Sequence, residues 1–368
     1  MKTAVVFGTR PEAIKMAPIV KELERRQMSH IVIVTAQHRE MLDQKLRVFD
    51  ITPHYDLDIM RHNQDLFYLT SSVLNKIKAV LIKEKPDILL VQGDTTTTFA
   101  ASLAAFYLKI PVGHVEAGLR TWNRMNPYPE EINRQITTRL TQFHFAPTRW
   151  AKDNLLREGI PDDNIFVTGN TVIDALLMIV DPYFQFTDKP LCDIDFIHRR
   201  ILLLTSHRRE NFGEPMEQIF LACRHLVEHY PDVELVYPVH PNPNVREIAG
   251  KIFKGVTRTH IIEPLEYRSF VQLMKKSYLI LTDSGGVQEE APTLGKPVLV
   301  LRTTTERPEA IEAGTARLVG TNRDAIIREA QLLLTDSAVY MEMSTKANPY
   351  GDGKAAQRIV DIISTKVR

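Results

Sequence analysis

Two spacings of hydrophobic residues alternate along the chain. Short apolar runs, many of them β-branched, recur through the first half, at 3–8, 31–36, 87–92, 111–116, 143–147 and 165–169. Longer stretches with helical spacing lie in the gaps, as at 11–26, 71–84 and 95–108. Strands that alternate with helices indicate βαβ units and a parallel sheet. The first half is therefore predicted to be one doubly wound α/β domain.

A second series of the same kind follows an irregular stretch. Residues 181–198 carry Asp-Pro, Lys-Pro and scattered aromatic residues without a clear period, which is typical of a connection between domains. Short apolar runs then return at 201–205, 234–238, 260–263, 278–282, 297–301 and 316–319. Apolar positions within 355–363 predict a closing amphipathic helix that could cross back to the first domain.

The length of 368 residues also favours two domains. We predict an N-terminal Rossmann-like domain over 1–175, joined by the closing helix 353–368, and a C-terminal Rossmann-like domain over 176–352. A cleft between two such domains would be available for a ligand.

Charge and cysteine content narrow the function classes. Lys plus Arg number 46 and Asp plus Glu 45, so no global excess of charge favours a nucleic acid or an anionic membrane. Cys192 and Cys223 are too few for a disulfide framework and lack the spacing of a zinc site. No export signal is visible, and no apolar stretch approaches the roughly 20 residues of a membrane-spanning helix. We expect a soluble, cytoplasmic protein.

Ligands of open parallel sheets bind beyond the carboxyl ends of the strands. Residues 8–15 follow the first strand, where Gly8 lets backbone approach a ligand and two cations, Arg10 and Lys15, are placed for phosphate charge. The alternative is a tight turn with Pro11 at the first helical position. The segment is not G-x-G-x-x-G, so it does not specify a dinucleotide.

Acidic residues follow the next strands. Asp94 could transfer a proton or simply cap a helix. Glu116 shares a strand face with His114 by alternation, although a lone glutamate there is usually a solvated rim residue. Glu130 and Arg134 are four apart and would meet on a helix, where the alternative is a surface ion pair.

The second half places cations at a strand end. His207 is followed by Arg208 and Arg209, which suits phosphate oxygens, although a basic turn is possible. Further on, His240 ends a strand and could contact ligand or cap a turn, and Arg302 could add charge or lie on the surface.

A strand end, a glycine turn and a helix start occupy 283–290, where the first residue is Asp283. Backbone N–H groups of Ser284, Gly285 and Gly286 could hold a diphosphate without a metal ion. Glu290 could accept bonds from both ribose hydroxyls or be another solvated glutamate. No H-E-x-x-H, paired C-x-x-C or Walker lysine motif is present, so neither a metalloenzyme nor a P-loop kinase is supported.

Several segments together carry a family resemblance. The chain resembles the non-hydrolysing UDP-N-acetylglucosamine 2-epimerases in FGTRPEAIKMAP, QGDTTTT, GHVEAGLR, PEEINR, SHRREN, YPVHPNPNVRE, LTDSGGVQEEAP, GKPVLVLR and TERPEA, in order through nearly its whole length. The resemblance implies two Rossmann-like domains of the glycosyltransferase-B type, with UDP in the interdomain cleft. It also implies a homodimer.

The resemblance assigns roles by position. Asp94, Glu116 and Glu130 are the acidic residues expected around C2 of the sugar, with His207 near the UDP phosphates. The expected contacts of the UDP-sugar are Arg10, Lys15, Arg134, Phe270, Ser284, Gly285, Gly286, Glu290 and Arg307. Leu265 stands where a uracil-contacting glutamine is expected, which weakens one contact.

The implied reaction is reversible epimerisation of UDP-N-acetylglucosamine to UDP-N-acetylmannosamine, through elimination of UDP to 2-acetamidoglucal and re-addition. It needs no hydride transfer, hence no cofactor and no metal, and its product would serve the synthesis of bacterial-type surface polysaccharides. Which carboxylate removes and which delivers the C2 proton stays open.

Some relatives also bind UDP-N-acetylglucosamine as an activator through two glutamines three residues apart. The matching positions here are Gln37 and Glu40, and a carboxylate could repel diphosphate. Arg208 and His240 match the rest of that possible allosteric site. The alternatives to the epimerase are a hydrolysing epimerase that releases N-acetylmannosamine, a glycosyltransferase of the same fold, and a catalytically silent nucleotide-sugar-binding regulator.

Overall fold

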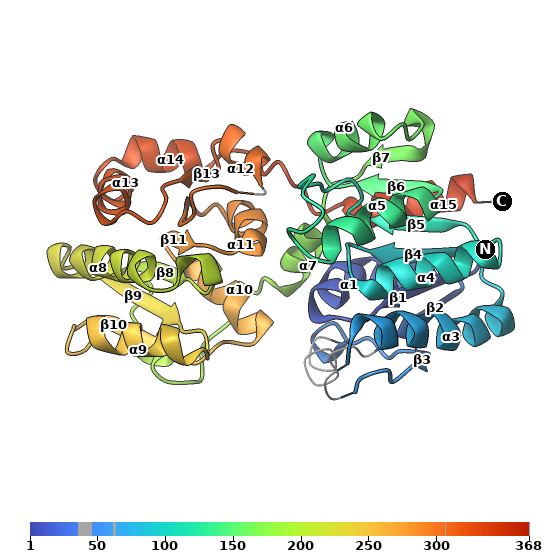
Figure 1. The fold of residues 1–368 in the computed structure, drawn as a ribbon. Helices are drawn as coiled ribbons and strands as arrows, with labels where there is room; N and C mark the ends of the chain where they lie inside the picture. Colours follow the sequence, from blue (N-terminus) through green and yellow to red (C-terminus); the bar gives the residue numbers. More distant parts are fainter. Residues whose placement is uncertain (36–45, 62–63, 306, 368) are drawn as a thin grey trace. The chain divides into compact units, whose positions relative to one another are not determined.

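A computed structural model describes residues 1–35, 46–61, 64–305 and 307–367 (Figure 1). The chain forms two compact units: unit 1 comprises Met1–Met178 with Tyr350–Arg368, and unit 2 comprises Ile179–Pro349. The chain thus leaves unit 1 after Met178 and returns to it at Tyr350. The predicted domain boundaries lie after residue 175 and after residue 352.

Unit 1 is built on a parallel sheet. Its described residues form seven strands in the order β3-β2-β1-β4-β5-β6-β7. The strands are β1 (Thr3–Phe7), β2 (His30–Val34), β3 (Tyr55–Asp56), β4 (Ile88–Gln92), β5 (Val112–Val115), β6 (Phe143–Ala146) and β7 (Ile165–Val167). Six of them were predicted. The prediction missed β3 because a two-residue edge strand shows no periodicity.

Helices follow the strands of unit 1 and bury their apolar sides against the sheet. They are α1 (Arg10–Arg25), α3 (Leu66–Glu84), α4 (Thr96–Tyr107), α5 (Glu130–Leu140), α6 (Arg149–Arg157), α7 (Thr171–Ile179) and the closing helix α15 (Ala355–Lys366), with a 3₁₀ turn η1 (Asp162–Asn164). Val73 and Ile77 of α3 pack in one core with Ala101 of α4 and Leu89 of β4. The closing helix packs on α1.

Unit 2 repeats the architecture. Its sheet runs β10-β9-β8-β11-β12-β13, again all parallel. The strands are β8 (Arg200–Thr205), β9 (Val233–Pro238), β10 (Thr259–Ile262), β11 (Leu279–Thr282), β12 (Val298–Val300) and β13 (Ala316–Leu318). Every one of them was predicted to within one residue at each end, because each lies at a short apolar run between stretches with helical spacing.

Helices of unit 2 enclose a second core around Leu202, Phe220, Leu235 and Tyr237. They are α8 (Glu214–His229), α9 (Pro243–Ile252), α10 (Tyr267–Lys276), α11 (Gly285–Glu290), α12 (Pro308–Glu312), α13 (Arg323–Thr335) and α14 (Ser337–Ser344), with 3₁₀ turns η2 (Leu191–Asp193), η3 (Arg209–Asn211) and η4 (Ala291–Leu294). In each sheet the strand order reverses at one point, between β1 and β4 and between β8 and β11. Ligand sites of such folds lie at these points.

No helix within the described ranges is long and apolar enough to cross a membrane.

Candidate active site

The loops after β1, β4 and β5 meet at the carboxyl edge of the unit 1 sheet, and a buried glutamate joins two of them. Glu12 is 1% exposed and accepts hydrogen bonds from Gly8 N at 3.0 Å and Thr9 N at 2.7 Å. Its other oxygen accepts from the hydroxyls of Thr95 at 2.7 Å and Thr98 at 3.2 Å. Burial raises the pKa of Glu12. The sequence analysis read 8–15 only as a phosphate loop or a tight turn, although Thr9-x-x-Glu12 is a capping-box signal.

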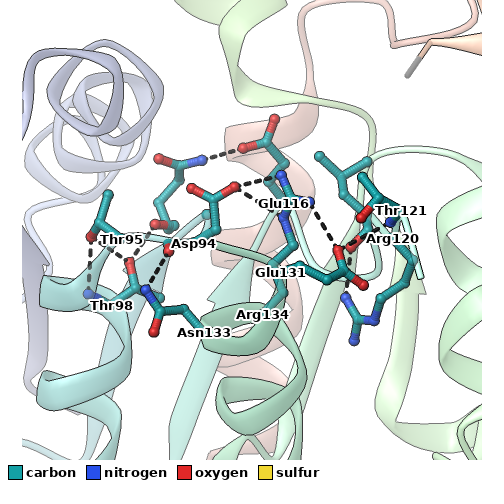
Figure 2. Close-up of polar contacts among 12 residues, drawn as sticks. Asp94, Thr95, Thr98, Glu116, Arg120, Thr121, Glu131, Asn133 and Arg134 are labelled. Carbon is teal, nitrogen blue, oxygen red and sulfur yellow. Dashed lines mark hydrogen bonds and ion pairs between the residues drawn. The ribbon is translucent and has the colours of Figure 1, made fainter. Parts of the chain in front are cut away.

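Asp94 lies just before α4 and does not cap it. The N-cap is Thr95, whose side chain accepts from Thr98 N. The cap alternative for Asp94 is therefore wrong, because the helix begins one residue later. Asp94 is 28% exposed in its side chain and accepts two hydrogen bonds from Arg134, at 2.9 Å from Nε and 2.6 Å from Nη2 (Figure 2).

Arg134 reaches across to Asp94 instead of pairing along its own helix. It also donates to Glu131 at 3.2 Å, and the predicted contact with Glu130 is wrong. Glu131 is fully buried and accepts from Thr121 N and Trp122 N, so it shapes the loop after β5 (Figure 2). A buried guanidinium gains more from a bidentate carboxylate than from a solvated neighbour one turn away.

Glu130 is the first residue of α5 and half-buried. In the part of the chain that the structure describes, no hydrogen bond or ion pair is recorded for it. Glu130 thus differs from Asp94 and Glu116, which both have cationic partners.

Glu116 follows β5 in a left-handed backbone conformation, with φ of 64°. It is 7% exposed, so the solvated-rim alternative is wrong. One oxygen accepts from Asn170 Nδ2 at 3.0 Å and from Lys15 Nζ, and the other accepts from Gln92 Nε2. A left-handed non-glycine residue held by several partners is typical of functional sites.

His114 does not share a face with Glu116. β5 ends at Val115, and the left-handed turn at Glu116 breaks the alternation that the sequence analysis assumed. His114 is fully buried with Nε2 2.7 Å from the carbonyl oxygen of Gly93, and burial lowers its pKa to about 3. It is therefore neutral and structural.

The structure brings Asp94 and Glu116 together around Arg134. Burial lowers the pKa of Arg134, but the charges of Asp94, Glu131 and Glu116 outweigh it and raise the pKa above the ordinary value. Arg134 is paired with Asp94 and Glu131, and the Glu116 carboxylate on the neighbouring loop contributes to the same electrostatic environment. Lys15, expected at phosphate, pairs with Glu116, whereas Arg10 is exposed at the start of α1.

In unit 2 a second buried carboxylate organises the loop after β8. Asp283 is fully buried, and its Oδ2 accepts from Ser206 Oγ, His207 N, Arg208 N and Asn211 Nδ2 at 2.9 to 3.1 Å. This role was not predicted, because Asp283 was taken only as part of the strand, glycine turn and helix start at 283–290. The signal that could have found it is a carboxylate at the end of the strand next to β8.

His207 stands on that loop. Its side chain is 41% exposed, and Nδ1 lies 3.3 Å from Asp283 Oδ1, an ion-pair distance without hydrogen-bond alignment. The ring stacks on His240 with centroids 5.7 Å apart. Burial, the first cause, and the nearby Arg208 and His240 lower the pKa of His207, although Asp283 opposes them.

The turn after β11 presents backbone to two guanidinium groups. Ser284 is the N-cap of α11, and a Cβ atom at Gly285 would lie 3.8 Å from Arg307 Nη2 and 3.9 Å from Arg208 Nη2. Arg307 is held in place by an ion pair with buried Glu289. Two guanidinium groups thus lie close to the backbone of this turn, an arrangement that suits the binding of an anion.

The remaining predicted contacts are spread over the same edge of unit 2. Glu290 is buried and accepts from the Tyr267 hydroxyl at 2.7 Å, so it is not a solvated glutamate. Phe270 is half-buried on α10. His240 is exposed, and its Nδ1 accepts from Asn242 N at 3.2 Å, as expected of the capping alternative.

Gln37 and Glu40, two of the predicted activator contacts, lie outside the described residues. Arg302 is buried and pairs with Glu210. Within the described ranges, no group of three or more His, Cys, Asp or Glu residues is arranged to hold a metal ion.

Comparison with known proteins then identifies the family. The family model described as UDP-N-acetylglucosamine 2-epimerase matches residues 21–364. A UDP-N-acetylglucosamine 2-epimerase of Bacillus subtilis is 57% identical, over 98% of this chain and 94% of that protein. The chain belongs to the UDP-N-acetylglucosamine 2-epimerase family.

Solved structures of this family share the fold. A putative UDP-N-acetylglucosamine 2-epimerase from Listeria monocytogenes superimposes with a TM-score of 0.94 at 53% identity, over 99% of this chain and 96% of that one. The Neisseria meningitidis UDP-GlcNAc 2-epimerase bound to UDP-GlcNAc gives 0.89 at 51% identity, with full coverage of both chains. The predicted glycosyltransferase-B type of fold, with two parallel α/β sheets, is confirmed.

Proposed function

We propose that this protein interconverts UDP-N-acetylglucosamine and UDP-N-acetylmannosamine without hydrolysis. The observation that carries the proposal is the pair of carboxylates, Asp94 and Glu116, which come from different loops and are each held by a cation. Membership of the UDP-N-acetylglucosamine 2-epimerase family supports the substrate. The Neisseria meningitidis relative was solved with UDP-GlcNAc bound.

The chemistry explains the need for two acidic groups. The C2 hydrogen is not adjacent to a carbonyl, so simple carbanion formation would face a prohibitive barrier. A carboxylate takes the C2 proton, the C–H electron pair forms the C1–C2 double bond, and the C1–O pair leaves with UDP. Re-addition delivers a proton to the opposite face of C2 while the phosphate oxygen returns to C1.

Two faces of the sugar require two proton carriers. Asp94 and Glu116 fill these roles in the proposal, with Glu130 as the third acidic residue near C2. In the proposal one of them takes the C2 proton as a carboxylate, the other gives up its own proton to the opposite face as a carboxylic acid, and Arg134 and Lys15 hold the two side chains in place. The reaction transfers no hydride, so the proposal requires no nicotinamide cofactor.

The residues of unit 2 are assigned to UDP. The diphosphate would contact the Ser284–Gly286 turn and Arg307, Glu290 would accept from the ribose hydroxyls, and Phe270 would pack on the base. Arg10, a residue of unit 1, would add positive charge for the phosphates.

His207 would stabilise UDP as it leaves. The imidazolium form can donate an N–H from Nε2 to a phosphate oxygen while Nδ1 stays 3.3 Å from Asp283 Oδ1. Burial disfavours that form in the free chain, and a bound diphosphate would raise the pKa of His207 again.

Three further proposals rest on the family relationship. The protein forms a homodimer, its product supplies bacterial-type surface polysaccharide precursors, and Arg208 and His240 contribute to a possible activator site with Gln37 and Glu40. Mass measurement in solution and the dependence of rate on UDP-N-acetylglucosamine concentration test the first and third.

The test is incubation of the purified protein with UDP-N-acetylglucosamine in deuterated water, followed by NMR. We expect UDP-N-acetylmannosamine deuterated at C2, in equilibrium with deuterated substrate. Free N-acetylmannosamine with UDP would instead identify the hydrolysing epimerase. An unchanged C2–H signal despite demonstrated binding would favour the regulator, and UDP release that depends on an added acceptor would favour a glycosyltransferase.

A further inference from the structure

Asn170 lies just before α7, the helix along which the chain leaves unit 1, and its side chain links two parts of that unit. It is 2% exposed and directly precedes α7. Its Oδ1 accepts from Val172 N at 3.1 Å, and its Nδ2 donates to Glu116 Oε1 at 3.0 Å. Because a backbone N–H occupies the oxygen, the amide orientation is fixed and the nitrogen must face the carboxylate.

The returning segment of the chain is bound to the same residue. The backbone N–H of Asn170 donates to the carbonyl of Tyr350 at 2.7 Å. Gly169 and Gly351 permit this close approach, since a Cβ atom at Gly169 would lie 3.3 Å from the Tyr350 oxygen. Asp174 accepts from Ala355 N and Ala356 N at the start of α15, so the outgoing and returning segments are joined within unit 1.

Glu116 needs such support because its backbone is held in an unfavourable region. A left-handed conformation costs a non-glycine residue free energy and persists only when its surroundings fix it. Lys15 of α1 and Gln92 of β4 donate hydrogen bonds to the Glu116 carboxylate. Asn170, just before α7, donates a third.

We propose that Asn170 is a positioning residue that holds the Glu116 carboxylate in the orientation needed for proton transfer. The inference rests on the proposed function of Glu116. It goes beyond that function by assigning the orientation of a proton carrier to the segment through which the chain leaves unit 1.

The physical reason is the charge on the acceptor. A hydrogen bond from a neutral amide to a buried carboxylate stabilises the ionised form, so its removal raises the pKa of Glu116 and loosens its rotamer. Asn170→Ala removes the donor. Asn170→Asp keeps the size and the acceptor for Val172 N but places a second carboxylate beside Glu116.

The first measurement is the pH profile of kcat for C2–H exchange into deuterated water. For Asn170→Ala we expect kcat to fall about 10- to 100-fold, with KM unchanged within about twofold and the acidic limb moved to higher pH. Asn170→Asp should move the limb further. The matched control is Asp174→Asn, which disturbs the join to α15 without touching Glu116 and should leave the limb in place.

A second measurement does not depend on activity. NMR titration of ¹³C-labelled glutamate carboxyls in wild type and Asn170→Ala should show the pKa of Glu116 raised in the variant. An unmoved Glu116 titration in a folded variant overturns the proposal. An equal shift of the acidic limb in Asp174→Asn also overturns it, because the effect would then come from chain docking. Loss of exchange in the wild type would instead refute the proposed function.

Discussion

The carboxylates of unit 1 and the cations of unit 2 lie beyond the carboxyl ends of similar sheets, but their charges are handled differently. Asp94 and Glu116 are compensated inside unit 1 by Arg134 and Lys15. In unit 2, Arg307 is fixed by Glu289 and its guanidinium lies close to the backbone at Gly285. Carboxylates held by cations suit proton transfer in a defined geometry, whereas a guanidinium held beside a glycine turn suits the binding of an anion.

His114 of unit 1 and His207 of unit 2 show the same contrast. His114 in unit 1 is fully buried and neutral, and His207 in unit 2 is partly exposed beside Asp283. This contrast fits the proposal that unit 1 carries the chemistry and unit 2 binds UDP. Three experiments test the contrast.

The largest effect is expected from Glu116→Gln. The variant keeps the shape of the side chain but removes the group that takes or delivers the C2 proton, so kcat for epimerisation and for C2–H exchange should fall about 10²- to 10⁴-fold. Titration calorimetry should find the affinity for UDP changed by less than about threefold. A large loss of UDP affinity in this folded variant would contradict the assignment of unit 1 to chemistry.

A smaller effect, on UDP binding and not on kcat, is expected from Gly285→Ala. The added methyl would make ordinary contacts of 3.8 to 3.9 Å with Arg307 and Arg208, so the fold should tolerate it. It would occupy the space proposed for phosphate and should weaken UDP binding about 10- to 100-fold, the loss of a charge-assisted contact, while kcat at saturation stays within a few-fold.

Gly250→Ala is the matched control, since no atom lies within 4 Å of a Cβ atom at that helical position. This change should leave UDP affinity unaltered and the protein as stable or slightly more stable. Unchanged UDP affinity in Gly285→Ala would remove the turn after β11 from the proposed site.

The smallest effect concerns stability and pH. The pKa of His114 is lowered from 6.5 to about 3 in the folded chain, so between these values the unfolded chain binds a proton that the folded chain does not. Stability should therefore fall as pH decreases below about 6.5, with His114 accounting for a loss of about 2 kcal/mol at pH 5. Denaturant unfolding of wild type and His114→Gln measures this difference. Equal pH dependence of the two proteins would show that His114 is not a buried neutral group.

Local pattern predicted the strands of the chain well where short apolar runs alternate with helical spacing. The strands of unit 2 were placed to within one residue at each end, whereas β3, with two residues at a sheet edge, left no pattern to read. Within the site, local pattern failed where a side chain had a choice of partners. Glu130 seemed the partner of Arg134 from spacing, but the guanidinium reaches Asp94.

Two features could be predicted from the sequence alone: the formation of two parallel α/β units, and the position of acidic and basic residues at the ends of their strands. Period and strand-end position are local properties, so they can be read without coordinates. The tertiary structure alone decided the partners: Asp94 with Arg134, Glu116 with Lys15, and Glu116 with Asn170, which are 40, 101 and 54 residues apart. The physical reason is that packing of the sheet brings distant loops together, and buried charges then select the partners that geometry offers.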